Sequence, residues 1–126
     1  MDESLIGVRG RDSKTELLDA IRPQFVILKP SLLGGFAESQ EWVDLAEERR
    51  MGWWATSALE SNLGLYAISQ WAKNGVRTRN PLLLQGLGTG GLFTNNVSGT
   101  LEVKGGQLIN HPGGQWPNLT EFFTQP

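Results

Sequence analysis

Cysteine is absent from the 126 residues of the chain. Its absence excludes a disulfide framework and any metal site built on thiolates. Apolar runs of membrane-spanning length are missing too, and the first ten residues, MDESLIGVRG, contain no apolar core of a signal peptide. These absences favour a cytoplasmic protein. They also make the Asn-x-Ser/Thr triplets at Asn96 and Asn118 chance matches, because glycosylation requires secretion.

A strong charge of either sign is missing as well. The net charge is −2, and no basic cluster alternates with aromatic residues. We therefore expect neither nucleic acid nor an anionic membrane as a partner. Hydrophobic residues make up 39% and charged residues 19% of the chain, which is typical of a folded domain, and the length suffices for one.

Three short apolar runs recur along the chain. FVIL, WWA and LLL begin at Phe25, Trp53 and Leu82, 28 and 29 positions apart, which is about the length of one strand with its crossover helix. Runs that are apolar nearly throughout predict parallel strands covered on both faces. The pattern indicates an α/β architecture, either a doubly wound sheet or part of a barrel. Three such strands cannot close a barrel, so the chain is expected to be part of something larger.

The segments between these runs predict helices. DSKTELLDAI opens with the capping-box spacing of Ser13 and Glu16, and NLGLYAISQWAKNG ends at Asn74 and Gly75, a typical helix stop. ESQEWVDLAEERR also shows a helical period. Its acidic residues are expected to face solvent: Glu38, Glu41, Asp44, Glu47 and Glu48.

The pattern changes after Gly91. TLEVKGGQLIN alternates around two glycines, which predicts a β-hairpin. His111, the only histidine, begins a tail rich in Gly and Pro, and a structural role is favoured for it over a catalytic one. The aromatic residues of this tail are expected to anchor it: Trp116, Phe122 and Phe123.

Polar residues and glycines follow each apolar run, where α/β enzymes collect their reacting groups. Lys29 follows the first run, Thr56 and Ser57 follow the second, and GLGTGG follows the third from Gly86. The glycines match a dinucleotide fingerprint, but LFTNNVSGT after them is a poor helix, so a nucleotide site is disfavoured. Glycines that let the backbone approach a substrate explain the pattern better.

Asp2 and Glu3 would lie at a further strand end if another strand preceded them. Together with Lys29 they suggest a metal-plus-lysine site, since a carboxylate is a natural Mg²⁺ ligand. One aspartate cannot hold the ion alone. From the residues alone, Lys29 is explained equally by snorkelling to solvent and by a functional role.

Four segments in this order resemble a known family: DESL, VILKPSLLGG, SALESNLGLYAISQWA and GLGTG. They are similar to the C-terminal half of the o-succinylbenzoate synthases of the enolase superfamily. The specific parts are the strand-end lysine before a proline and the S-x-x-E-S-x-L-G-L pattern. The resemblance implies about three parallel βα units from the C-terminal part of a (β/α) barrel in residues 1–94. It also implies a hairpin and tail, residues 95–126, that pack on the barrel or on a capping domain.

The resemblance also implies roles for the strand-end residues. Lys29 would be the second of two active-site lysines, and Asp2 the last of three carboxylate ligands of Mg²⁺. Glu3 would support Asp2 without binding the ion itself. Contacts to the substrate are implied for three positions: Thr56, Ser57 and Gly86.

The family's Lys-x-Lys motif, which supplies the base, has no counterpart in this chain, nor do the two other metal carboxylates. The resemblance thus implies the C-terminal portion of a hydro-lyase. The whole enzyme would dehydrate a cyclohexadiene carboxylate to o-succinylbenzoate in menaquinone biosynthesis, and the chain alone is expected to be inactive.

Two alternatives remain open at this point. One is another enolase-superfamily enzyme, such as a racemase, dipeptide epimerase or cycloisomerase. The other is a non-catalytic α/β binding domain. The expected partners are a small carboxylate substrate and either the missing part of the barrel or further copies of the chain.

Overall fold

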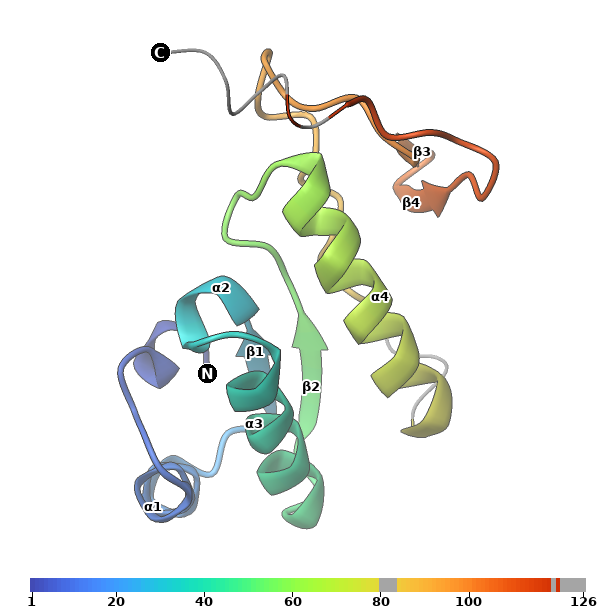
Figure 1. The fold of residues 1–126 in the computed structure, drawn as a ribbon. Helices are drawn as coiled ribbons and strands as arrows, with labels where there is room; N and C mark the ends of the chain where they lie inside the picture. Colours follow the sequence, from blue (N-terminus) through green and yellow to red (C-terminus); the bar gives the residue numbers. More distant parts are fainter. Residues whose placement is uncertain (80–83, 119, 121–126) are drawn as a thin grey trace.

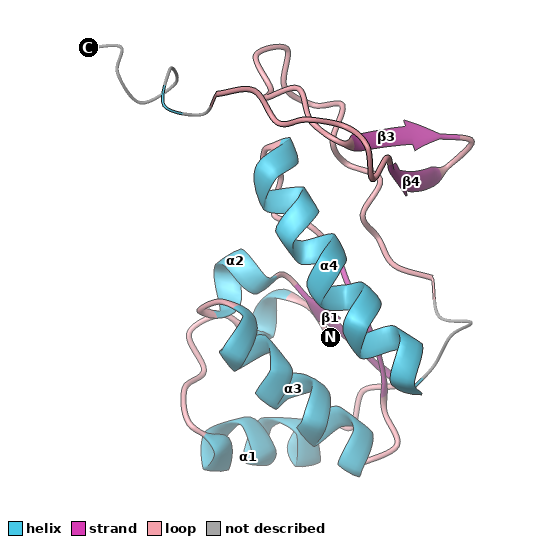
Figure 2. Ribbon diagram, turned by 45° about the vertical axis from the view of Figure 1, so that its right-hand side comes forward, coloured by secondary structure: helices cyan, strands magenta, loops and turns pink. Residues whose placement is uncertain are grey.

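The computed structural model describes residues 1–79, 84–118 and 120 (Figure 1). In chain order, the elements are the 3-10 helix η1 (Glu3–Leu5), α1 (Arg11–Ile21), β1 (Phe25–Leu28), α2 (Pro30–Leu33), α3 (Phe36–Glu48), β2 (Gly52–Ala55), α4 (Asn62–Arg79), β3 (Leu101–Lys104) and β4 (Gln107–Asn110). Figure 2 shows α4 in front of the parallel strands and α3 beside them, with α1 crossing near one end of α3. In the part of the chain that the structure describes, no helix has the length and apolarity needed to cross a membrane.

The strands β1 and β2 pair in parallel along their whole length, from Phe25 opposite Gly52 to Leu28 opposite Ala55. This pairing confirms the α/β prediction with a parallel sheet. The third predicted strand starts at Leu82, which lies outside the described residues. The segment after it is placed, however, because Gly86 forms a parallel bridge with the residue that follows β2.

Met1 occupies the other edge of β1. Its amino group donates a hydrogen bond of 2.7 Å to the carbonyl of Phe25, and its carbonyl accepts one of 2.8 Å from the amide of Ile27. This pair of bonds is the pattern of a parallel neighbour. Four segments therefore lie side by side in the order Met1, β1, β2 and Gly86.

One face of this sheet supports the core, because burial alternates along both strands. The buried residues of β1 and β2 are Val26, Leu28, Trp53 and Ala55. The sequence predicts cover on both faces, but this is wrong for the residues that the structure describes. Three apolar side chains on the opposite face stay at least partly exposed: Phe25, Ile27 and Trp54. The rings of Phe25 and Trp54 pack against each other there, with their centroids 5.4 Å apart.

The start of α1 differs from the prediction. The helix begins at Arg11 with Gly10 at its N-cap, so the predicted capping box of Ser13 and Glu16 is wrong. Gly10 reaches a φ of 77° there, a conformation that glycine adopts without steric cost. Lys14 lies one helical turn before Leu18, on the same side of α1, and both side chains are fully buried.

Lys14 is held by the acidic face of α3. Its ammonium lies 2.5 Å from Glu38 Oε2, also binds Glu41, and sits 5.5 Å from the centroid of the Trp42 ring. The prediction that the acidic residues of this helix merely face solvent is therefore wrong for these two. Their spacing of three positions puts both carboxylates on one side of α3, where α1 packs.

The helix α4 passes through its predicted stop at Asn74 and Gly75 and continues to Arg79. A Cβ on Gly75 would lie 3.4 Å from Cη2 of Trp53. The glycine thus lets the helix pack closely on the indole ring of β2 instead of ending there. On the preceding turns of α4, a second core cluster joins the helix to the sheet and to the segment after Gly86: Ala55, Leu65, Ile68, Ala72 and Leu87.

The predicted hairpin is confirmed, because β3 and β4 pair antiparallel. Gly105 and Gly106 both have positive φ, 58° and 75°, as a two-residue turn that follows the strand twist requires. The tail anchor Trp116 packs edge-on against Tyr66 of α4, with ring centroids 5.5 Å apart. The other two proposed anchors, Phe122 and Phe123, lie outside the described residues. His111 bonds Glu102 at 2.9 Å on the surface of the hairpin, in agreement with a structural role.

The buried lysine makes stability depend on pH. The hydrogen bond from Lys14, with the attraction of its charge, holds the pKa of Glu38 below its ordinary value of 4.5. A lowered folded-state pKa stabilises the fold above the unfolded value, and this stabilisation is lost as the pH falls through the folded value. We expect Lys14→Met to lower Tm by several degrees at pH 7, because two neighbouring carboxylates lose their cation. The difference in Tm from the parent should shrink below pH 4.5.

Thermal unfolding followed by circular dichroism between pH 3 and pH 8 measures both effects. Lys104→Met is the matched control, since Lys104 is exposed on the hairpin and its loss should change little. A Lys14→Met deficit in Tm that is equally large at pH 3 and pH 7 would contradict the ion-pair explanation.

Candidate active site

The carboxyl ends of four neighbouring segments meet at one edge of the sheet. Asp2 follows Met1, Lys29 follows β1, Thr56 follows β2, and Gly86 pairs with Thr56. Adjacent parallel strands lie about 4.8 Å apart, so side chains at these ends reach one another across the row. Every residue that the sequence predicted for the site belongs to this row or is next to it.

Lys29 is directed toward Asp2 rather than into open solvent. Its side chain is 18% exposed, and its ammonium lies 2.9 Å from Oδ2 of Asp2 and 3.9 Å from Oε1 of Glu3. The residues on either side, Leu28 and Pro30, are buried and fix the backbone that carries it. The structure thus brings together the three residues from which a metal-plus-lysine site was predicted.

Asp2 is held by the turn that follows it. The carbonyl of Asp2 accepts the amide of Leu5 at 3.1 Å, and Leu5 is buried in the core. Asp2 stands at the N-cap of η1, yet its side chain makes no capping hydrogen bond. Its carboxylate therefore faces Lys29, while the Glu3 side chain, 81% exposed, extends toward solvent.

Hydroxyl groups line the other half of the row. Thr56 Oγ1 donates a 2.8 Å hydrogen bond to the carbonyl of Gly86, whose amide donates to the carbonyl of Ala55 at 2.8 Å. Ser57 is buried, and its hydroxyl bonds that of Thr89. The sequence predicted Thr56, Ser57 and Gly86 but missed Thr89. The signal available for Thr89 was its place as the one hydroxyl residue in the GLGTGG loop.

Asp2 could supply one ligand to a metal ion. Its carboxylate is a hard oxygen donor, is 36% exposed, and stands at the open edge of the sheet. Among residues 1–79, 84–118 and 120, no group of three or more His, Asp or Glu side chains is placed to hold a metal. Of the described residues, Asp2 thus suits one ligand of a Mg²⁺ ion.

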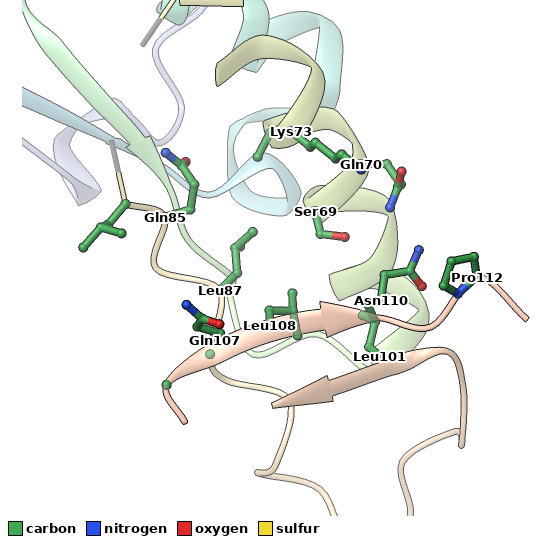
Figure 3. A pocket seen from close by; sticks show the side chains of 14 residues that line it. Ser69, Gln70, Lys73, Gln85, Leu87, Leu101, Gln107, Leu108, Asn110 and Pro112 are labelled. Atoms are coloured by element: carbon green, nitrogen blue, oxygen red, sulfur yellow. The ribbon is translucent and has the colours of Figure 1, made fainter. Parts of the chain in front are cut away.

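A cavity of about 660 Å³ lies between α4 and the β3–β4 hairpin, beside the Gly86 end of this row (Figure 3). Lys73 is the only charged side chain among the described residues that line it. The Ser69 hydroxyl donates to the carbonyl of Tyr66, and Gln85 Oε1 accepts the amide of Ala55, each at 2.7 Å. Lys29 is not among its lining residues. We therefore assign the candidate active site to the strand ends and not to this cavity.

The fold and the strand-end groups define a parallel α/β protein that gathers a lysine, a carboxylate and several hydroxyls at one sheet edge. No family model matches the chain. It is 56% identical over 108 residues to an o-succinylbenzoate synthase of Desulfotalea psychrophila, a match that covers 86% of the chain. The crystal structure of MenC from the same organism is similar at a TM-score of 0.77 and 55% identity, over 85% of this chain.

The match covers only part of each relative. The chain spans 28% of the curated o-succinylbenzoate synthase and 29% of the MenC chain. The sequence match and the structural match nevertheless include 86% and 85% of this chain. The resemblance to the o-succinylbenzoate synthases that the sequence motifs indicated is therefore confirmed.

The bond between Thr56 and Gly86 predicts a modest effect on stability. Thr56→Val keeps the shape of the side chain and removes its hydroxyl donor. Because the bond is exposed, we expect a loss of about 0.5–1 kcal/mol in the free energy of unfolding, measured by urea denaturation. Thr15→Val on α1 is the control, since threonine and valine have similar helix propensities. A Thr56→Val protein as stable as the parent would show that this bond does not hold the sheet edge.

Proposed function

We propose that this chain forms part of the active site of an o-succinylbenzoate synthase, a Mg²⁺-dependent hydro-lyase of menaquinone biosynthesis in the cytoplasm. The pair formed by Lys29 and Asp2 at adjacent segment ends carries the proposal. It places the Lys29 ammonium beside a carboxylate that could bind a metal, at the carboxyl ends of parallel strands, where α/β enzymes have their active sites. The 56% identity to an o-succinylbenzoate synthase supports the choice of reaction.

Lys29 would stabilise negative charge on the substrate. When a base removes the proton next to the substrate carboxylate, charge develops on the carboxylate oxygens before water is lost. A compact ammonium held in place beside them stabilises that charge without reorganisation. The packed stem of Lys29 and its contact with Asp2 keep the ammonium at one position.

Thr56, Ser57 and Gly86 would bind the substrate from the neighbouring strand ends. Ser57 is buried and bonded to Thr89, so its hydroxyl has a fixed direction. A Cβ on Gly86 would lie 3.2 Å from Oγ1 of Thr56, so the glycine keeps the two segments close. The substrate would thus meet backbone and hydroxyl groups on one side and the ammonium on the other.

Of this chain's residues, Asp2 would bind the Mg²⁺ ion, and Glu3 would support Asp2 without binding the ion itself. The ion, when bound, supplies positive charge that favours the developing anion. The Lys29 ammonium bonds Oδ2 of Asp2, and the other carboxylate oxygen of Asp2 would bind the metal. The remaining ligands and the base would come from outside this chain.

The partly exposed face of the sheet supports a larger barrel. Phe25, Ile27 and Trp54 form an apolar surface that a further layer of strands would cover. We propose that the remaining part of a (β/α) barrel is this layer. In its absence, copies of the chain would associate through the same face.

The purified chain alone should not form o-succinylbenzoate above the background rate with Mg²⁺ present. Loss of a general base commonly costs about 10²–10⁴-fold, and Asp2 alone leaves the metal site incomplete. A coupled assay of o-succinylbenzoate formation tests this. Turnover that requires Mg²⁺ and disappears in Lys29→Ala would reveal a complete site within the chain and refute the proposed division.

A chimera tests the proposed function directly. In it, this chain replaces the matching 28% of the Desulfotalea enzyme, and the chimera should convert the cyclohexadiene carboxylate to o-succinylbenzoate. Lys29→Arg should lower kcat and kcat/KM together by about 10²–10³-fold, because a planar guanidinium cannot replace a compact ammonium beside the developing charge. Lys104→Arg on the exposed hairpin is the control. Near-normal kcat in the Lys29→Arg chimera would show that the Lys29 ammonium does not stabilise the developing charge.

A further inference from the structure

The loop after β2 folds back on itself through Glu60. Its Oε2 accepts a 2.7 Å hydrogen bond from the amide of Ala58. Between the two residues, Leu59 adopts a φ of 66°, a left-handed conformation that is rare for a residue with a branched side chain. A contact that holds such a turn stabilises a loop that would otherwise relax.

The other oxygen of Glu60 reaches a second loop. Oε1 accepts a 2.6 Å hydrogen bond from the hydroxyl of Ser31, which lies in the first turn of α2, two positions after Lys29. One carboxylate therefore joins the segment that follows β1 to the segment that follows β2. The same loop contains the buried Ser57, whose Oγ accepts the amide of Leu59 at 3.4 Å.

The start of α4 is shaped to admit this side chain. A Cβ on Gly64 would lie 2.9 Å from the Cβ of Glu60, a distance that side chains do not tolerate. The glycine thus leaves room for Glu60 beside the first turn of α4. Glu60 thus has space at Gly64, a left-handed neighbour in Leu59, and two hydrogen bonds to its carboxylate.

We infer that Glu60 is a positioning residue that fixes the Lys29 and Ser57 loops relative to each other, an inference that rests on the proposed function. Both of its partners, the Ser31 hydroxyl and the Ala58 amide, donate, so a group with two acceptor oxygens satisfies both. Among the described residues, no hydrogen bond or ion pair joins Glu60 to Lys29 or Ser57. Its effect on the reaction comes through the distance between their two loops, and small errors in such distances are costly.

Three variants in the chimera separate positioning from other roles. Glu60→Ala removes both contacts, and we expect kcat to fall about 10–10²-fold with a smaller change in KM. Glu60→Gln keeps an acceptor for Ala58 and offers an amide that Ser31 Oγ can accept, so kcat should recover to within a few-fold of the parent. Ser31→Ala should lie between the two, and adding it to Glu60→Ala should cause no further loss.

Hydrogen exchange in the 126-residue chain gives a readout that does not need turnover. Glu60→Ala should speed exchange of the Ala58 amide and of the α2 amides, while Glu60→Gln should leave them near the parent rates. Glu16→Ala, which removes an exposed carboxylate on α1, is the matched control for both assays. Its exchange rates and kcat should equal those of the parent.

The outcomes are distinct. Glu60→Gln as inactive as Glu60→Ala would overturn positioning in favour of proton transfer or charge, and a Glu60→Ala chimera with normal kcat would overturn any role. If the unmodified chimera is inactive, the proposed function fails, and hydrogen exchange decides the loop contact alone. Unchanged Ala58 exchange in Glu60→Ala would then overturn the inference as well.

Discussion

Leu28 and Ala55 stand opposite each other in the last pair of β1 and β2, and both are fully buried. Their burial fixes the register, because a shift by one residue would turn every core side chain of a strand to the open face. The register in turn makes Lys29 and Thr56 neighbours, since each is the next residue of its strand. Asp2, which follows Met1, and Gly86 extend the same row on either side. The positions of the candidate site residues therefore follow from a packing constraint that lies behind them.

Much of this framework could be predicted from the sequence. FVIL and WWA are apolar runs of strand length, and KGGQ between alternating segments specifies a hairpin turn, so local patterns were sufficient for both. The buried Lys14 was not predictable in this way. Its position on α1, four residues before Leu18, places it on the apolar face, but its partners are Glu38 and Glu41 on another helix. Only the packing of α1 on α3 shows that the lysine is paired.

The site shows the same division between local and non-local information. The strand-end rule identified Lys29, Thr56 and Ser57, and the structure brings them to one edge. The contact of Ser31 with Glu60 spans 29 positions and that of Ser57 with Thr89 spans 32. Both contacts depend on the conformation of the loops that follow the strands, and loop conformation is hard to predict from sequence because loops vary more than the strands they connect. The left-handed turn at Leu59 is of this kind, since leucine gives no sign of it.

A site built on strand ends can be divided between segments because each segment positions its own group. The Lys29 ammonium is held by burial of Leu28 and Pro30 and by Asp2, all within the first 30 residues. The Ser57 hydroxyl is held by β2 and by the GLGTGG loop. Two features couple the Lys29 segment to the Ser57 segment. One is the register of β1 and β2, and the other is the Glu60 carboxylate, which bonds both of the loops that follow these strands. Under the proposed function, the rest of a barrel would cover the apolar face of Phe25, Ile27 and Trp54 and would supply the base and the other metal ligands.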